Sequence, residues 1–228
     1  MALAVCGAAA ALGAQVWKDK PISQWTPEEA KQVLADSPWV KTVTPTIDKS
    51  ISVPRTTAGP GGIGIGGVGI GLPGMGRRGI NGQTSRGPDN GKSPTVEIPK
   101  LTLRWASALP VGSAELIARE VNAPAVDEDH YAIAVYGLPA RWMQGDPDRL
   151  GGELARSAVL KRENKKDIKA SSAEVLMRDD GPVILYLFPR TEISRNDPQV
   201  EFEAAIGRLK IDQAFVPGEM IYQGKLEL

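Results

Sequence analysis

Residues 17–39 read WKDKPISQWTPEEAKQVLADSPW and hold three of the five tryptophans of the chain. Thr26 followed by Pro27 is a strong helix-start signal, because threonine caps helix N-termini and proline fits the first helical position. Glu29 lies three residues after Thr26 and can complete a capping box. Pro38 ends the helix, because the residue before a proline is pushed out of the α region. The pattern predicts a short helix that begins at Pro27.

The tryptophans around this helix have two interpretations. Ala30, Val33 and Leu34 form a narrow apolar stripe, and a helix this short is not stable alone in water. It must therefore lie against another element, with Trp25 and Trp39 as anchors at its two ends. The functional alternative is an exposed aromatic binding platform at Trp25 and Trp39. We favour packing, because aromatic side chains dominate the energetics of cores.

The first segment, 1–14, is predicted to be a signal peptide. It carries no charged residue, is rich in small and apolar side chains, and is too short to cross a bilayer. The single cysteine, Cys6, lies within it and is expected to leave with it. The mature chain would then hold no disulfide and no cysteine nucleophile. We expect a bacterial protein exported to the periplasm or the extracellular space.

A glycine-rich segment divides the rest of the chain. Fourteen of the 33 residues from Gly59 to Gly91 are glycine, which raises the entropic penalty of ordering and leaves few side chains to bury. Residues 55–95 are therefore predicted to be a disordered insert. The flanking parts, a tryptophan-rich helical segment at 15–54 and an α+β sheet domain at 96–228, are expected to pack as one domain.

Strand patterns dominate residues 96–228. Leu101, Leu103 and Trp105 alternate with polar residues, which is typical of a half-buried strand. Residues 131–136 are apolar on both faces and are expected inside a sheet. Further strands are predicted at 40–43, 46–53, 175–178, 183–188, 200–206, 209–211 and 220–228. Hairpin-length connections between the late strands indicate a mainly antiparallel sheet with about three short helices packed on one face.

Two of those helices are predicted in the second half of the chain. Ser113 can cap one whose inner face is Ala114, Ile117 and Val121. Asp146 and Pro147 repeat the cap-plus-proline signal and open a helix with Leu150, Leu154 and Ala158 on one side. Gly151 and Gly152 weaken that second helix by up to about 1 kcal/mol each.

His130, the only histidine, is the weak catalytic candidate. Beside Asp127, Glu128 and Asp129 it could act as a general base or a metal ligand, but one histidine cannot make the multi-histidine site that zinc favours. The acidic run is also typical of a solvated hinge. No nucleophile-elbow motif accompanies it, although a Ser-His-Asp arrangement is recognised only by geometry.

Other charged groups favour structural interpretations. Asp179 and Asp180 precede Gly181 and are expected to form a tight turn. Lys161, Arg162, Lys165 and Lys166 form a basic cluster diluted by acids, which indicates a solvated helix end rather than a nucleic-acid patch. Lysine plus arginine and aspartate plus glutamate number 27 each, so the overall charge does not suggest nucleic acid.

Three stretches together resemble a family of exported proteins of unknown function from soil bacteria of the acidobacterial type. The resemblance rests on residues 17–39, on Arg104 to Val111, and on Tyr222 to Leu228. It would cover most of the mature chain except the glycine-rich insert. The resemblance implies export and transfers no catalytic residue and no cofactor.

Two functional hypotheses follow. The first is a non-enzymatic exported module with a binding or structural role in the cell envelope, which uses Trp25, Trp39 or a sheet edge to bind a protein or envelope component. The alternative is a hydrolase that uses His130 with a nearby carboxylate. We expect no cofactor, no metal, no nucleic-acid partner and no membrane-spanning segment.

Overall fold

A computed structural model describes residues 16–48, 98–119, 124, 126–140, 143, 147–179 and 181–228. The predictions for the signal peptide at 1–14, with Cys6, and for the glycine-rich insert at 55–95 lie outside these residues. So do Val121, Asp146 and Asp180. No described helix is long and apolar enough to span a membrane.

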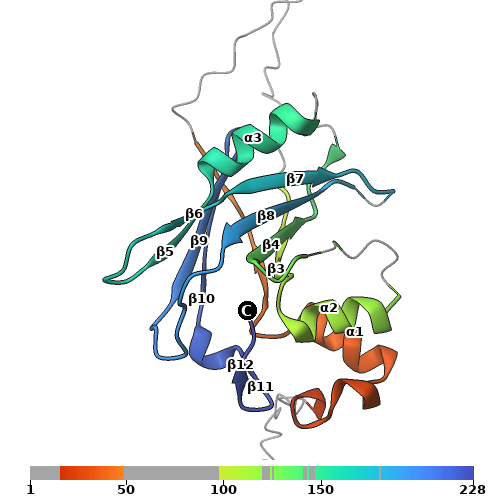
Figure 1. Cartoon of the computed structure of the whole chain (residues 1–228). Helices are drawn as coiled ribbons and strands as arrows, with labels where there is room; N and C mark the ends of the chain where they lie inside the picture. Colours follow the sequence, from red (N-terminus) through yellow and green to blue (C-terminus); the bar gives the residue numbers. More distant parts are fainter. Residues whose placement is uncertain are drawn as a thin grey trace, which may run out of the picture. The chain divides into compact units, whose positions relative to one another are not determined.

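The described part is an α+β fold built mainly from antiparallel strands, which confirms the predicted class (Figure 1). One sheet has the order β1 (Val40–Val43), β3 (Leu101–Trp105), β4 (His130–Tyr136), β8 (Val183–Pro189) and β7 (Ser172–Leu176). The second has the order β2 (Thr46–Ile47), β10 (Leu209–Phe215), β9 (Val200–Ile206), β5 (Val159–Arg162) and β6 (Ile168–Lys169). A short ribbon joins β11 (Ile221–Tyr222) to β12 (Lys225–Leu226).

The two five-stranded sheets share two segments of chain. β1 runs directly into β2 past Pro45, and β6 runs directly into β7 past Ala170. Each segment therefore contributes a strand to both sheets, as at the corners of orthogonally packed sheets. Counting each shared segment once, eight strands follow one another in the order of a barrel, while the outer edge of β7 pairs with no described strand. The sequence pattern predicted most of these strands, but it predicted neither β5 and β6 nor the division between two sheets.

Aromatic side chains from both sheets fill the space between them. Trp105 of β3 packs edge-on against Phe215 of β10, with ring centres 5.2 Å apart. Tyr186 of β8 packs in the same way against Phe202 of β9 at 5.4 Å. All four side chains are buried. The interior is therefore a packed core, as expected when eight strands close.

The first helix, α1 (Pro27–Ala35), matches its prediction. The Glu29 backbone N–H donates to Thr26 Oγ1 at 3.2 Å, and the Thr26 N–H donates to the Glu29 carboxylate at 2.9 Å. Both halves of the capping box are thus present. Ala30, Val33 and Leu34 are buried, as their spacing predicts. The helix lies against α2 (Leu109–Ile117).

The start of α2 differs from its prediction. The helix begins at Leu109 and includes Pro110 in its first turn, so Ser113 is an interior residue rather than the cap. Proline is tolerated there because the first N–H groups of a helix have no intrahelical acceptor. The last helix, α3 (Pro147–Ser157), contacts β7 and β9, so the helices do not share one face of one sheet.

Short 3-10 turns complete the described elements. They are η1 (Val16–Asp19), η2 (Ile22–Gln24) and η4 (Pro217–Glu219). The first two bring Trp17 and Trp25 to the end of the sheets where α1, α2 and the β11–β12 ribbon lie (Figure 1).

Candidate functional site

The tryptophans of the opening stretch form an aromatic cap, defined here as Trp17, Trp25, Trp39 and Tyr222. Trp17 contacts both other tryptophans with ring centres 5.9 Å apart, and Trp25 packs edge-on against Tyr222 at 5.7 Å. Trp25 Nε1 donates to the Trp17 carbonyl at 3.1 Å. Trp39 Nε1 donates to the Glu227 carbonyl at 2.7 Å. Residues 17–39 and 222–228 are thereby held together.

This geometry rules out the hypothesis that Trp25 and Trp39 form an exposed aromatic binding platform. Trp25 is only 7% exposed, Trp39 is fully buried, and both indole N–H groups donate to internal carbonyl oxygens. A binding platform requires ring faces at the surface, and neither ring has one there. Trp25 and Trp39 are packing residues.

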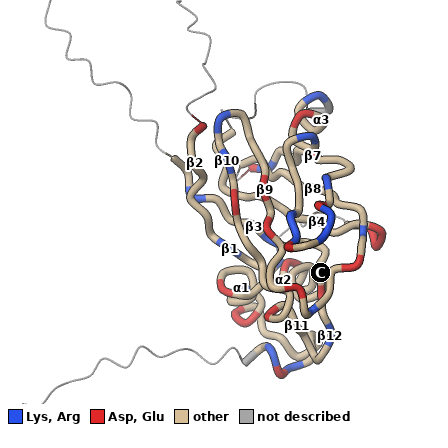
Figure 2. The backbone as a smooth tube through the Cα atoms, turned by 90° about the vertical axis from the view of Figure 1, so that its left-hand side faces the viewer, with Lys and Arg blue, Asp and Glu red and all other residues tan. Residues whose placement is uncertain are grey.

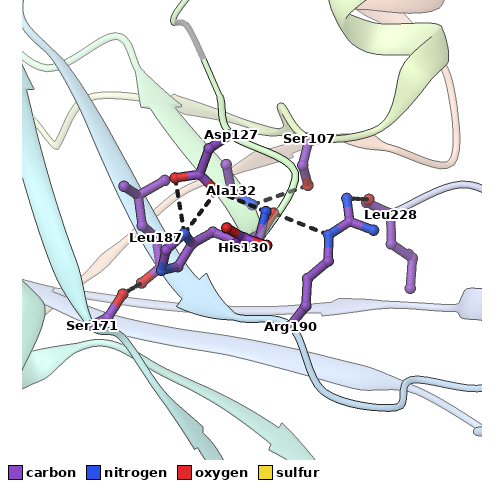
Figure 3. Close-up of polar contacts among 9 residues, drawn as sticks. Ser107, Asp127, His130, Ala132, Ser171, Leu187, Arg190 and Leu228 are labelled. Carbon is purple, nitrogen blue, oxygen red and sulfur yellow. Dashed lines mark hydrogen bonds and ion pairs between the residues drawn. The ribbon is translucent and has the colours of Figure 1, made fainter.

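His130 stands at the first position of β4, beside Asp127 (Figure 3). Its Nδ1 lies 2.8 Å and 3.0 Å from the two Asp127 carboxylate oxygens. The hydrogen bond with His130 lowers the pKa of Asp127 despite partial desolvation. The Arg190 Nε donates to the His130 carbonyl at 3.4 Å. Since the imidazole is 28% exposed, the contact is an exposed pair at a strand end.

The two serines drawn near His130 do not supply a nucleophile (Figure 3). The Ser107 hydroxyl accepts from the Ala132 N–H at 3.0 Å, and the Ser171 hydroxyl donates to the Leu187 carbonyl at 3.0 Å. Within the described ranges, Asp127 is the one side chain bonded to the imidazole. A histidine and a carboxylate are present, and the hydroxyl of a triad is not among their contacts.

The basic cluster lies on a strand and a turn rather than at a helix end, which corrects its prediction. Lys161 and Arg162 belong to β5, because α3 ends at Ser157 and residues 159–162 pair with β9. Lys161 pairs with Glu203, and Lys165 Nζ lies 2.6 Å from Asp197 Oδ1. These ammonium groups are balanced by carboxylates from neighbouring segments. Asp179 lies in the β7–β8 connection, as predicted.

Three carboxylates gather on β9 and β10, a group that the sequence analysis missed. Glu201, Glu203 and Asp212 place oxygens within 4.8 Å of one another, and Figure 2 shows acidic positions along these strands. A hydrogen bond shared with Asp212, followed by desolvation, raises the pKa of Glu201. Period-two spacing could have revealed the group, since cross-strand neighbours share a face. Lys161 already opposes this charge at Glu203.

A groove opens between α3 and β7, with a volume of about 680 Å³. We call it the α3–β7 groove; its lining includes Gly152, Arg156, Lys169, Ser172, Glu174 and Leu176. β7 is the last strand of its sheet, so β8 pairs with only one of its edges. The groove therefore borders a sheet edge.

Gly151 explains how α3 approaches this edge so closely. A Cβ at position 151 would lie 2.3 Å from the Ala173 carbonyl oxygen of β7, a separation that real Cβ atoms do not reach. At Gly152 a Cβ would instead make an ordinary contact, 3.7 Å from the Arg156 guanidinium. The glycine pair that weakens the helix in isolation thus allows one residue to touch the strand and leaves room in the groove at the next.

The chain matches no family model, no curated protein and no solved structure in comparisons with each. Its resemblance to exported proteins of acidobacterial soil bacteria therefore stays a prediction.

Proposed function

We propose that the protein is an exported, non-enzymatic binding module of the bacterial cell envelope, and that the α3–β7 groove is its binding surface. The observation that carries the proposal is the position of the groove along the edge of β7. The interior between the sheets is filled by aromatic side chains, and the described tryptophans, Trp17, Trp25, Trp39 and Trp105, are buried. Among the surfaces of the described residues, a groove at a sheet edge suits an extended segment of another protein.

Charge and size narrow the class of partner. Small residues on both walls, Gly152 and Ala155 on α3 and Ala170 and Ser172 beside them, leave space for side chains of an extended peptide. Arg156 and Lys169 line the same groove with a single acid, Glu174. The Arg156 Nε donates to the Gly152 carbonyl at 2.9 Å, which holds its guanidinium at the groove wall. A peptide with acidic side chains complements this lining.

The test is a selection from displayed random peptides on the protein, followed by affinity measurements on the selected sequences. We expect enrichment of acidic extended peptides. Gly152→Gln places a long side chain in the groove, where a Cβ makes only an ordinary contact with Arg156. It should weaken peptide binding at least about tenfold, the loss of one good contact. Gly112→Gln is the matched control, because Gly112 lies on α2 and a Cβ there meets nothing within 4 Å.

Two outcomes would refute the groove as the binding surface. Either the selection yields no specific peptide, or Gly152→Gln and Gly112→Gln bind the selected peptides as tightly as the unaltered protein does. The hydrolase alternative is tested on the same preparations with chromogenic esters and phosphoesters. Turnover that disappears in His130→Ala would support hydrolysis at the His130–Asp127 pair and contradict the non-enzymatic proposal.

A further inference from the structure

A partly buried charged cluster lies where α2 meets β3 and β4. Glu115 of α2 is only 1% exposed, and its Oε1 lies 3.1 Å from Arg104 Nη1 of β3. The Tyr136 hydroxyl of β4 donates to the same carboxylate at 3.0 Å. The Arg104 guanidinium also stacks over the Tyr136 ring, with its Cζ 4.4 Å from the ring centre. Glu115, Arg104 and Tyr136 therefore form one connected unit.

A second arginine reaches the same ring. Arg178 follows β7, and its Cζ lies 5.7 Å from the centre of the Tyr136 ring. Its Nη2 is shielded from solvent and meets no hydrogen-bond acceptor in the part of the chain that the structure describes. Among the described residues no carboxylate pairs with Arg178, whereas Arg104 pairs with Glu115. A desolvated guanidinium N–H without an acceptor is unfavourable, and native structures usually supply one.

We infer that Arg178, held against the Tyr136 ring, forms a binding site for an anionic group, a carboxylate or a phosphate. The contact with the ring restricts the guanidinium, and the planar N–H fork of arginine has the geometry that such oxyanions accept. Arg104 contacts the same ring but is already paired with Glu115, so the positive charge offered to an anion is that of Arg178. The cluster is separate from the α3–β7 groove, since neither arginine lines it.

The site is tested by thermal unfolding of the full chain in sodium phosphate, sodium acetate and sodium chloride at equal ionic strength. A ligand that binds only the folded state raises the melting temperature, so we expect phosphate or acetate to raise it by about 2–4 °C over chloride. Arg178→Gln should lose this increment. Arg149→Gln should keep it, because Arg149 is 82% exposed on α3 and pairs only with Glu153.

The class of ligand follows from which anion raises the melting temperature. An increment with phosphate alone assigns a phosphate site, one with acetate alone assigns a carboxylate site, and both together assign an oxyanion site of either source. Arg178→Lys keeps the charge without the fork and should bind the effective anion about tenfold more weakly. Equal melting temperatures in all three salts, or an undiminished increment in both Arg178 variants, would overturn the inference.

Discussion

The aromatic cap and the α3–β7 groove occupy different parts of the described fold and use opposite kinds of residue. The cap joins residues about 200 positions apart in the chain through large rings. The polar atoms of Trp25, Trp39 and Tyr222 donate to internal carbonyls, as when the Tyr222 hydroxyl donates to the Lys20 carbonyl at 2.6 Å. The groove is lined by glycine, alanine and serine with charged residues at its walls. The tryptophans of residues 17–39 are the more conspicuous signal in the sequence, yet in the structure they are packing residues. The candidate binding surface arises where side chains are small.

The largest effect should come from the cap. Trp39→Ala removes a fully buried ring and the donor to the Glu227 carbonyl, so the free energy of unfolding should fall by about 3–5 kcal/mol. Denaturant unfolding measures the change. Trp39→Phe keeps most of the apolar contact and should lose clearly less. If Trp39→Ala unfolds within 1 kcal/mol of the unaltered protein, the cap does not hold the fold together.

At the groove, two adjacent glycines should respond in opposite directions. Gly151→Ala drives a methyl group into the Ala173 carbonyl and should destabilise the protein by about 1–3 kcal/mol. Gly152→Ala meets only ordinary contacts and should stabilise it by up to about 1 kcal/mol through helix propensity. The same unfolding measurement compares them. Equal changes in both variants would mean that α3 does not approach β7 as described.

The sequence predicts the local features of this fold well. The start of α1 follows from Thr26 and Pro27, because a cap and a first-turn proline act over a few residues. β3 and β9 follow from strict alternation. The hairpin of β7 and β8 was also expected, although β7 begins at Ser172, earlier than its pattern indicated. Each of these signals is carried by neighbours in the chain.

Features that depend on distant residues were not predictable in this way. The turn from β1 into β2 and the turn from β6 into β7 divide the strands between two sheets, and only long-range pairing decides where they fall. The cluster of Glu115, Arg104 and Tyr136 likewise brings together three separate elements. The one local indication of this cluster in the sequence was a glutamate on the inner face of α2. His130 was chosen as a candidate because it is the one histidine of the sequence. The spacing of three residues between Asp127 and His130 allowed the contact that the structure contains.

The smallest effect concerns two glutamates that respond to acid in opposite senses. Hydrogen bonds from Lys20 and from the Thr26 backbone lower the pKa of Glu29 beside the cap. The stability that ionised Glu29 contributes is therefore present above its ordinary pKa of about 4.5. This stability is lost as the pH falls through the lowered pKa. On the outer face of β9, the hydrogen bond shared with Asp212 raises the pKa of Glu201, so protonation of Glu201 favours the folded state as the pH falls toward 4.5.

Melting temperatures recorded from pH 7 to pH 3 separate the two effects. Glu29→Gln should lose less stability than the unaltered protein over this range, because the acid-sensitive contact is already absent. Glu201→Gln should lose more, because it lacks the gain from protonation. The matched change from glutamate to glutamine makes each variant the control for the other. Parallel pH profiles for both variants would show that the carboxylate beside the cap is no better satisfied than the one on the outer strand. The contrast between a hydrogen-bonded carboxylate beside the cap and an acidic cluster on the outer strand would then fail.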